Sequence, residues 1–197
     1  DQLSKKHISS QLKSDLSFQN RKSKQFDYCV IHNPNNLKLS KLYIFKLKDY
    51  NNYSIRDFQI LGGHLRSLIS FYQEDKVGIY PDGVVSKKVS FINGISEMLI
   101  GSLLASYKFN KYKKINNKDN KIKKPSRVKI YSSSYSRLEK NYINVEAVSE
   151  GTALTRNLVT EPPNVMTPPE IAKNAESLEK FGIKVTVLGE KEMAKLG

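Results

Sequence analysis

Residues 157–172 read NLVTEPPNVMTPPEIA and contain four prolines within eight positions. Pro162 and Pro163 cannot continue a helix that arrives from the N-terminal side, because their rings clash with the preceding turn and they have no N–H to donate. They also favour an extended backbone at Glu161. The stretch therefore predicts a stiff elbow between two helices, and we assign it no chemistry of its own.

A helix is predicted directly after this elbow. Thr167 and Glu170 have the spacing of a capping box, and Pro168 falls at the first helical position, where a missing N–H costs nothing. Gly182 stands where a helix commonly ends in a left-handed residue. The predicted apolar face consists of Ile171, Ala172, Ala175, Leu178 and Phe181. Residues 183–189, IKVTVLG, are then expected to form a strand.

The helix before the elbow is predicted to begin at Asn141. Its inward side is expected from the near-helical spacing of five small or apolar residues, Val145, Val148, Thr152, Thr155 and Val159.

Further upstream, predicted strands alternate with predicted helices. The strands cover residues 26–32, 41–47, 76–83 and 127–133, and the helices cover residues 57–72 and 86–109. Expected inward residues of the first helix are Phe58, Leu61, Leu65, Leu68, Ile69 and Tyr72, and those of the second are Ile92, Ile95, Leu99, Leu103 and Tyr107. Gly62 and Gly63 each weaken a helix by about 1 kcal/mol relative to alanine, so packing must hold this one. The alternation predicts an α/β fold with a mixed sheet flanked by helices.

The charge of the 197-residue chain is distributed unevenly around its net value of +14. Residues 1–140 contain 27 basic and 11 acidic side chains, whereas residues 141–197 contain 6 and 8. This change of character predicts two structural units that meet near residue 140. The apolar stretch 89–107 is too interrupted for a membrane span, and the first residues lack the apolar core of a secretory signal, so we expect no membrane association.

Catalytic patterns are missing from the sequence. It contains no phosphate-binding loop of the G-x-x-x-x-G-K type and no G-x-S-x-G, H-E-x-x-H or C-x-x-C pattern. His7, His32 and His64 lie far apart in the sequence, and the single cysteine, Cys29, is expected to be a small buried residue of a strand. We therefore assign no catalytic, cofactor-binding or metal-binding residue in this chain.

A dense basic block is the one other candidate site. Between Lys108 and Lys129 there are ten basic residues and one acidic residue, with Tyr107, Phe109 and Tyr112 interleaved. Such a block could bind a phosphate backbone, and the candidate contacts are Lys113, Lys114, Lys123 and Lys124. The alternative is a solvated loop of Lys/Asn-biased composition, which we favour because nucleic-acid readers lean on arginine.

Three stretches of the chain resemble leucyl aminopeptidases. LIGSLLASYKFNKYK (99–113) resembles the end of the last long helix of their N-terminal domain. EGTALTRNLVTEPPNVMTPPEIAKNAESL (150–178) resembles their linker into the catalytic domain, and FGIKVTVLGEKEMAKLG (181–197) resembles the start of that domain. The Lys/Asn-rich loop departs from the family pattern.

The resemblance implies a macro-domain-like N-terminal α/β domain over residues 1–140, a linker helix with the proline elbow over 141–165, and the first helix and strand of a peptidase domain over 166–197. It also implies a cytoplasmic, hexameric enzyme that removes leucine-like N-terminal residues from peptides with two divalent metals, manganese or zinc. The family's catalytic and metal-binding residues would lie after Gly197, so the isolated chain is expected to be inactive and to serve assembly and positioning. Some bacterial members bind DNA, which agrees with the basic-block hypothesis.

Overall fold

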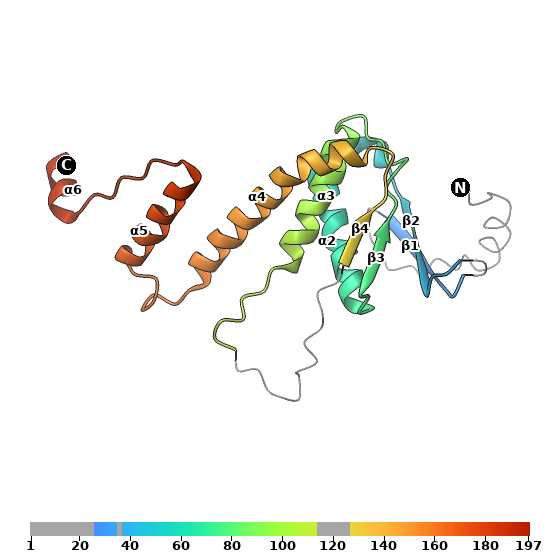
Figure 1. The fold of residues 1–197 in the computed structure, drawn as a ribbon, viewed down its shortest axis with the longest axis horizontal. Helices are drawn as coiled ribbons and strands as arrows, with labels where there is room; N and C mark the ends of the chain where they lie inside the picture. The colour runs from blue at the N-terminus through green and yellow to red at the C-terminus, as the bar shows by residue number, and fades with distance from the viewer. Residues whose placement is uncertain (1–25, 35–36, 114–126) are drawn as a thin grey trace.

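The computed structural model describes residues 26–34, 37–113 and 127–197. The strands are β1 (Phe26–His32), β2 (Lys41–Leu47), β3 (Lys76–Ile79) and β4 (Arg127–Ile130). The helices are α2 (Ile55–Phe71), α3 (Phe91–Ser106), α4 (Tyr135–Thr160), α5 (Pro168–Glu176) and α6 (Glu190–Leu196), with short 3-10 helices η1 (Tyr50–Asn52) and η2 (Ser177–Phe181). The α/β class predicted from the sequence is confirmed (Figure 1).

The strands form two pairs. β1 and β2 are antiparallel, with Cys29 opposite Ile44, and β3 and β4 are parallel, with Ile79 opposite Ile130. Among the described residues these are two separate two-stranded sheets, one antiparallel and one parallel, and not the single mixed sheet that the sequence predicted.

β3 and β4 are shorter than the sequence suggested because turn chemistry ends both of them. After β3, Pro81 has no N–H for a ladder and Gly83 has a φ of +98°. After β4, the hydroxyl of Ser132 and the backbone N–H of Ser133 donate to the carboxylate of Asp82 instead of to a neighbouring strand.

α2 and α3 pack against each other at very short range, and glycines permit it. A Cβ at Gly62 would lie 1.8 Å from the carbonyl oxygen of Met98, and one at Gly101 would lie 2.0 Å from the carbonyl oxygen of Gln59. The expectation that packing holds the glycine-containing helix is therefore confirmed. At Gly63, by contrast, the nearest atoms to an added Cβ are 3.9 Å away.

The hydrophobic core joins these helices to the strands. Its buried members are Phe26, Tyr28, Tyr53, Phe58, Leu61, Ile95, Met98 and Leu138. Cys29 is 2% exposed, as expected, and burial raises the pKa of its thiol. The ring of His64 contacts that of Phe26 edge to face at 5.1 Å, which agrees with a histidine that packs.

The predicted inward face of α3 is only partly right. Ile95 is buried, whereas Leu103 is 36% exposed. Gly94, Met98 and Gly101 are buried on the side that meets α2, and apolar spacing alone did not reveal them because two of the three have no side chain.

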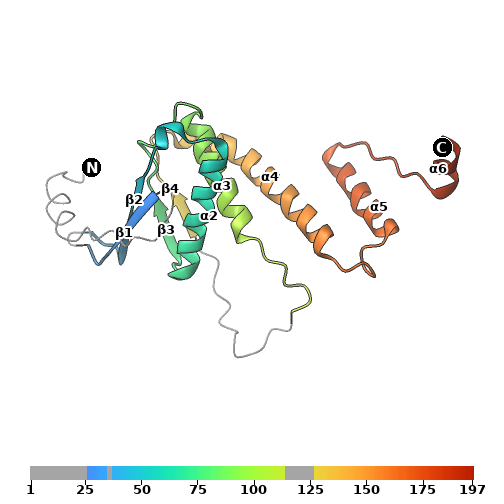
Figure 2. The same ribbon diagram turned by 180° about the vertical axis from the view of Figure 1, so that it is seen from behind.

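α4 begins at Tyr135, six positions before the predicted start at Asn141. It lies along α3, and the residues that it buries are Leu138, Val145 and Ser149. Val148 and Val159 of the predicted face are 51% and 80% exposed, because contact with α3 and not apolar spacing decides which side is covered. The far end of α4 points away from the strands, and α5 and α6 lie past it (Figures 1 and 2).

The segment after the elbow forms helices without a core. α5, η2 and α6 have no buried residue. Gly182 ends η2 with a φ of 82°, as predicted. Thr167 is the N-cap of α5, but its hydroxyl makes no cap hydrogen bond, so the predicted capping box is wrong. Pro168 and Pro169 remove two of the N–H groups that a cap would have to satisfy.

Residues 183–189 were predicted to form a strand, and in the structure they do not. A strand needs a neighbour to accept and donate its ladder hydrogen bonds, and in the described parts of the chain these residues have none. No helix of the described residues is long and apolar enough to cross a lipid bilayer.

Candidate functional site at the proline elbow

The elbow is a compact turn that begins at Glu161, directly after the last residue of α4. Glu161 is extended, with φ −62° and ψ 141°, and its N–H donates to the carbonyl oxygen of Asn157 at 3.1 Å. The carbonyl oxygen of Pro162 then accepts hydrogen bonds from the N–H groups of Val165 and Met166, each at 2.9 Å. The expected extended backbone at Glu161 and the rigid turn after it are confirmed.

The chain that follows α3 runs beside the end of α4. We call residues 107–112 the strap. The hydroxyl of Tyr107 donates to Oδ1 of Asn157 at 2.8 Å, and Nη1 of Arg156 donates to the carbonyl oxygen of Leu104 at 2.9 Å. The guanidinium of Arg156 also lies over the ring of Tyr107, 5.4 Å from its centre. These contacts join segments that are about fifty residues apart in sequence.

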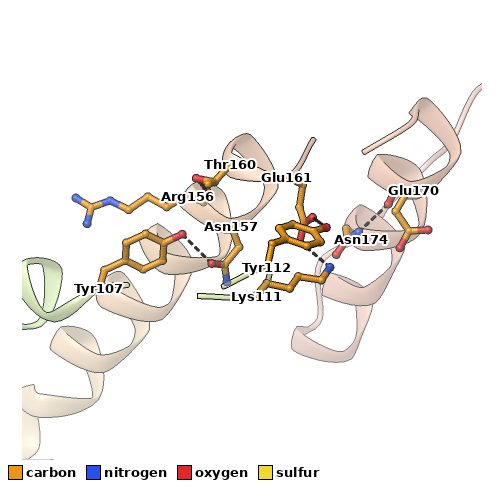
Figure 3. A network of polar contacts seen from close by, with 9 residues as sticks. All are labelled: Tyr107, Lys111, Tyr112, Arg156, Asn157, Thr160, Glu161, Glu170 and Asn174. Atoms are coloured by element: carbon orange, nitrogen blue, oxygen red, sulfur yellow. Dashed lines mark hydrogen bonds and ion pairs between the residues drawn. The ribbon is translucent and has the colours of Figure 1, made fainter. Parts of the chain in front are cut away.

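The far end of the strap holds Glu161 itself (Figure 3). Nζ of Lys111 lies 2.7 Å from Oε1 of Glu161, and the hydroxyl of Tyr112 donates to Oε2. The Glu161 side chain is only 8% exposed, whereas that of Lys111 is 55% exposed. Nζ of Lys111 also lies 5.5 Å from the centre of the Tyr112 ring. Both carboxylate oxygens of the last residue before the prolines are thus engaged.

These contacts stabilise the charged form of the pair. The hydrogen bond from Lys111, and then that from Tyr112, lowers the pKa of Glu161. The same carboxylate raises the pKa of Lys111 and that of the Tyr112 hydroxyl, in each case chiefly through the hydrogen bond. At neutral pH the site therefore contains a carboxylate, an ammonium and a neutral phenol, an arrangement suited to holding two segments together and not to proton transfer.

On the other side of the elbow, the polar side chains bond within their own helix. Nδ2 of Asn174 donates to the carbonyl oxygen of Glu170, one turn earlier in α5, at 2.7 Å. Figure 3 shows this pair on α5, separate from the strap and the end of α4.

The residues of the basic block have different positions in the structure. Lys113 is exposed at the end of the strap, and Lys114, Lys123 and Lys124 lie outside the described residues. Two of the interleaved aromatic residues are engaged elsewhere: the hydroxyl of Tyr107 is bonded to Asn157 of α4, and that of Tyr112 to Glu161, which directly follows α4. Sequence reasoning missed Arg156, Asn157 and Glu161, because a partner fifty residues away leaves no local pattern.

A hollow of about 680 Å³ lies between α2, α3, α4 and the β3–β4 pair. Much of its lining is aliphatic and continuous with the core, for example Leu65, Ile69 and Met98, and polar groups such as Arg66 and Glu139 also border it. We assign it no reaction.

The described residues do not fit a metal centre. They contain no group of three or more histidine, cysteine, aspartate or glutamate side chains that could hold an ion. A site for two divalent metals needs several such ligands, and we derive no metal-dependent step from this part of the chain.

The chain is similar in sequence to curated aminopeptidases. It is 32% identical to a probable cytosol aminopeptidase of Rhizobium leguminosarum over 165 residues, which are 83% of this chain and 32% of the relative. It is 41% identical to a probable cytosol aminopeptidase of Agrobacterium fabrum over 128 residues, which are 64% of this chain and 25% of the relative. It is 42% identical to one of Brucella suis over 103 residues, which are 52% of this chain and 21% of the relative. The chain thus spans about a fifth to a third of the length of these relatives. No protein-family model matches the chain.

Solved structures show the same fold. A mutant of tomato leucine aminopeptidase superposes with a TM-score of 0.62 over 96% of this chain and 36% of its own, at 16% identity. The bottromycin maturation enzyme BotP in complex with Mn superposes with a TM-score of 0.64 over 86% of this chain and 34% of its own, at 14% identity. Since the curated relatives share its sequence and a leucine aminopeptidase shares its fold, the chain belongs to the cytosol aminopeptidase family.

Proposed function

We propose that this chain is the N-terminal part of a metal-dependent leucyl aminopeptidase, which hydrolyses N-terminal residues, leucine-like ones preferred, from peptides. The observation that carries the proposal is the 32% identity over 165 residues to a probable cytosol aminopeptidase. The fold likeness to a leucine aminopeptidase over 96% of the chain supports it.

In this proposal the chain assembles and positions the enzyme, and the chemistry takes place elsewhere in the protein. Residues 1–140 form a non-catalytic α/β domain, residues 141–165 form the linker helix and elbow, and residues 166–197 begin the peptidase domain. α4 itself starts at Tyr135, a few residues before the proposed boundary at residue 140. Exposed apolar side chains after the elbow, such as Ile171 (51%) and Phe181 (70%), fit a segment that packs against further protein.

Two divalent metals, manganese or zinc, would activate the attacking water in the whole enzyme. Support comes from the structural neighbour BotP, which has been solved in complex with Mn. Because the described residues do not fit a metal site, the ligands would come from other parts of the protein. A cytoplasmic location and a homohexamer belong to the same proposal, the first supported by the name that the relatives bear.

A chimera tests the proposal. Residues 1–197 would replace the matching N-terminal part of the Agrobacterium fabrum relative, and release of leucine from a leucine p-nitroanilide substrate would be followed with and without Mn²⁺. We expect the chimera to be active and sensitive to a chelator, and the 197-residue chain alone to be inactive. The control is a chimera in which an unrelated α/β domain occupies the same place.

Two outcomes would contradict the proposal. Metal-dependent release of leucine by the 197-residue chain alone would show that it contains its own active site. A chimera that folds and binds metal but is no more active than the control would show that this chain is not the N-terminal part of such an enzyme.

Nucleic-acid binding through residues 108–129 stays a prediction, and the names of the relatives give it no support. Its test is a gel shift with duplex DNA at low salt. Binding by the unchanged chain that is lost in one combined variant would support it, and that variant carries Lys113→Glu, Lys114→Glu, Lys123→Glu and Lys124→Glu. No shift of the unchanged chain would dispose of the hypothesis.

A further inference from the structure

α4 has two halves with different support. The buried residues of this helix end at Ser149, and from there to Thr160 every residue is half-buried or exposed. Gly151 lies in open space, and the hydroxyls of Thr152 and Thr155 donate to the carbonyl oxygens one turn back. Glycine and back-bonded threonines both weaken a helix, so by local preference the outer half of α4 is its weak half.

The end of α3 and the strap compensate for the missing core contacts of this half. Their hydrogen bonds follow the same order along both segments: Leu104 of α3 with Arg156, then Tyr107 with Asn157, and then Lys111 and Tyr112 with Glu161. The last tie is made by the residue that immediately precedes Pro162. The support that the core provides as far as Ser149 therefore continues to the end of the helix.

The stiffness of the elbow makes the last tie important. Pro162 has a fixed φ and its carbonyl oxygen accepts two hydrogen bonds, so the turn itself absorbs little bending. A tilt of the backbone at Glu161 is then passed on to α5.

We propose that Lys111, Tyr112 and Glu161, together called the clasp, are positioning residues that hold the end of α4 and so fix the direction in which the elbow carries the following domain. The inference rests on the proposed function to the extent that the following domain is the catalytic one. Lys111 and Glu161 supply the charge pair, and Tyr112 fixes the second carboxylate oxygen.

A spin-label distance measurement tests the clasp on the 197-residue chain itself. Labels at Glu146→Cys on α4 and Lys173→Cys on α5, with buried Cys29 replaced by alanine, report the geometry across the elbow. We expect Glu161→Gln and Tyr112→Phe each to broaden the distance distribution. Glu150→Gln, which removes a carboxylate from an exposed position of the same helix, is the matched control and should change nothing.

Amide hydrogen exchange gives a second measurement on the same variants. Protection of residues 154–161 should fall about two- to fivefold in Glu161→Gln and Tyr112→Phe, the size expected when one partly exposed charged contact is lost. The reversed pair, Lys111→Glu with Glu161→Lys, should restore part of both readouts, because the ion pair returns but Tyr112 has no carboxylate at position 161 to donate to, whereas each reversal alone should restore neither. Unchanged distances and exchange in the single variants would overturn the proposal.

The chimera links the clasp to the reaction. In it, Glu161→Gln should lower kcat/KM at unchanged metal affinity, and the reversed pair should recover part of the loss. A broadened distance distribution with unaltered kcat/KM would overturn the positioning role. An inactive parent chimera would instead count against the proposed function, and the spin-label measurement would still decide whether the clasp holds the elbow.

Discussion

Two regions of the molecule contain similar helices with different surroundings. We call the described residues up to Ser149 the body and residues 166–197, after the elbow, the arm. Ser54 caps the start of α2 with a full capping box, and Thr167 is the N-cap of α5, whose first two residues are prolines. Both have an apolar face, yet α2 buries Phe58, Leu61 and Ile69 whereas α5 buries no residue. The difference teaches that local sequence signals are enough to predict a helix, whereas the burial of its apolar face depends on which other segment packs against that face.

The largest expected difference between the two regions is in the free energy of unfolding that is lost when a phenylalanine is replaced by alanine. Phe58 is 1% exposed, so Phe58→Ala should lower the free energy of unfolding by about 3–5 kcal/mol. Phe181 in the arm is 70% exposed, and Phe181→Ala should change the same quantity by less than about 0.5 kcal/mol. Urea denaturation measures both. Similar losses would mean that the arm is packed.

A glycine pair within α2 sharpens the picture of the body. Gly62→Ala would place a Cβ 1.8 Å from the carbonyl oxygen of Met98, so α2 and α3 must separate, at a cost of about 3 kcal/mol. Gly63→Ala meets nothing nearer than 3.9 Å and should gain up to about 1 kcal/mol of helix propensity. Thermal unfolding of the two variants checks the contrast. Equal effects would contradict the close helix contact.

The outer half of α4 lies between the two regions. An added Cβ at Gly151 has no atom within 4 Å, so Gly151→Ala should stabilise this half by about 1 kcal/mol and slow its amide exchange. Exchange within α2 should stay as it was. Faster exchange near residue 151 would indicate that α4 needs a bend there.

The smallest expected effect is on the pH dependence of the body. Burial alone would raise the pKa of Glu74, but hydrogen bonds from Lys41 at 2.7 Å and Tyr43 at 2.8 Å lower it below its ordinary value of 4.5. The folded pKa is thus below the unfolded one. The carboxylate therefore stabilises the fold above the unfolded pKa, and this is lost as the pH falls through the folded value.

Glu74→Gln should accordingly remove part of the fall in stability below pH 4.5. At neutral pH it should lower the free energy of unfolding by less than about 1 kcal/mol, because solvent screens the Lys41–Glu74 ion pair. Urea midpoints between pH 3 and pH 7 measure it. An unchanged pH profile would show that Glu74 makes no net contribution to the acid sensitivity.

Much of the fold could be predicted from local patterns. The strand positions at residues 26–32 and 41–47, the face of α2, the role of Pro168 and the left-handed Gly182 all follow from periodicity or backbone stereochemistry. The face of α4 and the length of β4 could not be predicted in this way. They depend on α3 and on Asp82, which are distant in sequence.

The candidate site divides in the same manner. The elbow itself was predictable, because a proline restricts its own φ and the conformation of the residue before it without help from the rest of the chain. The clasp of Lys111, Tyr112 and Glu161 was not predictable, because the local sequence around its lysine and tyrosine indicates only a basic block and says nothing of Glu161.

The sequence by itself determined which segments form helices, where the chain must turn stiffly and to which family it is similar, since each of these depends on neighbouring residues or on recurring motifs. Only the tertiary structure decided which helix faces are covered, that Gly62 and Gly101 let two helices touch, and that residues 183–189 find no neighbouring strand among the described residues. The physical reason is that burial and strand pairing are relations between segments, and their free energy exists only when both partners are in place.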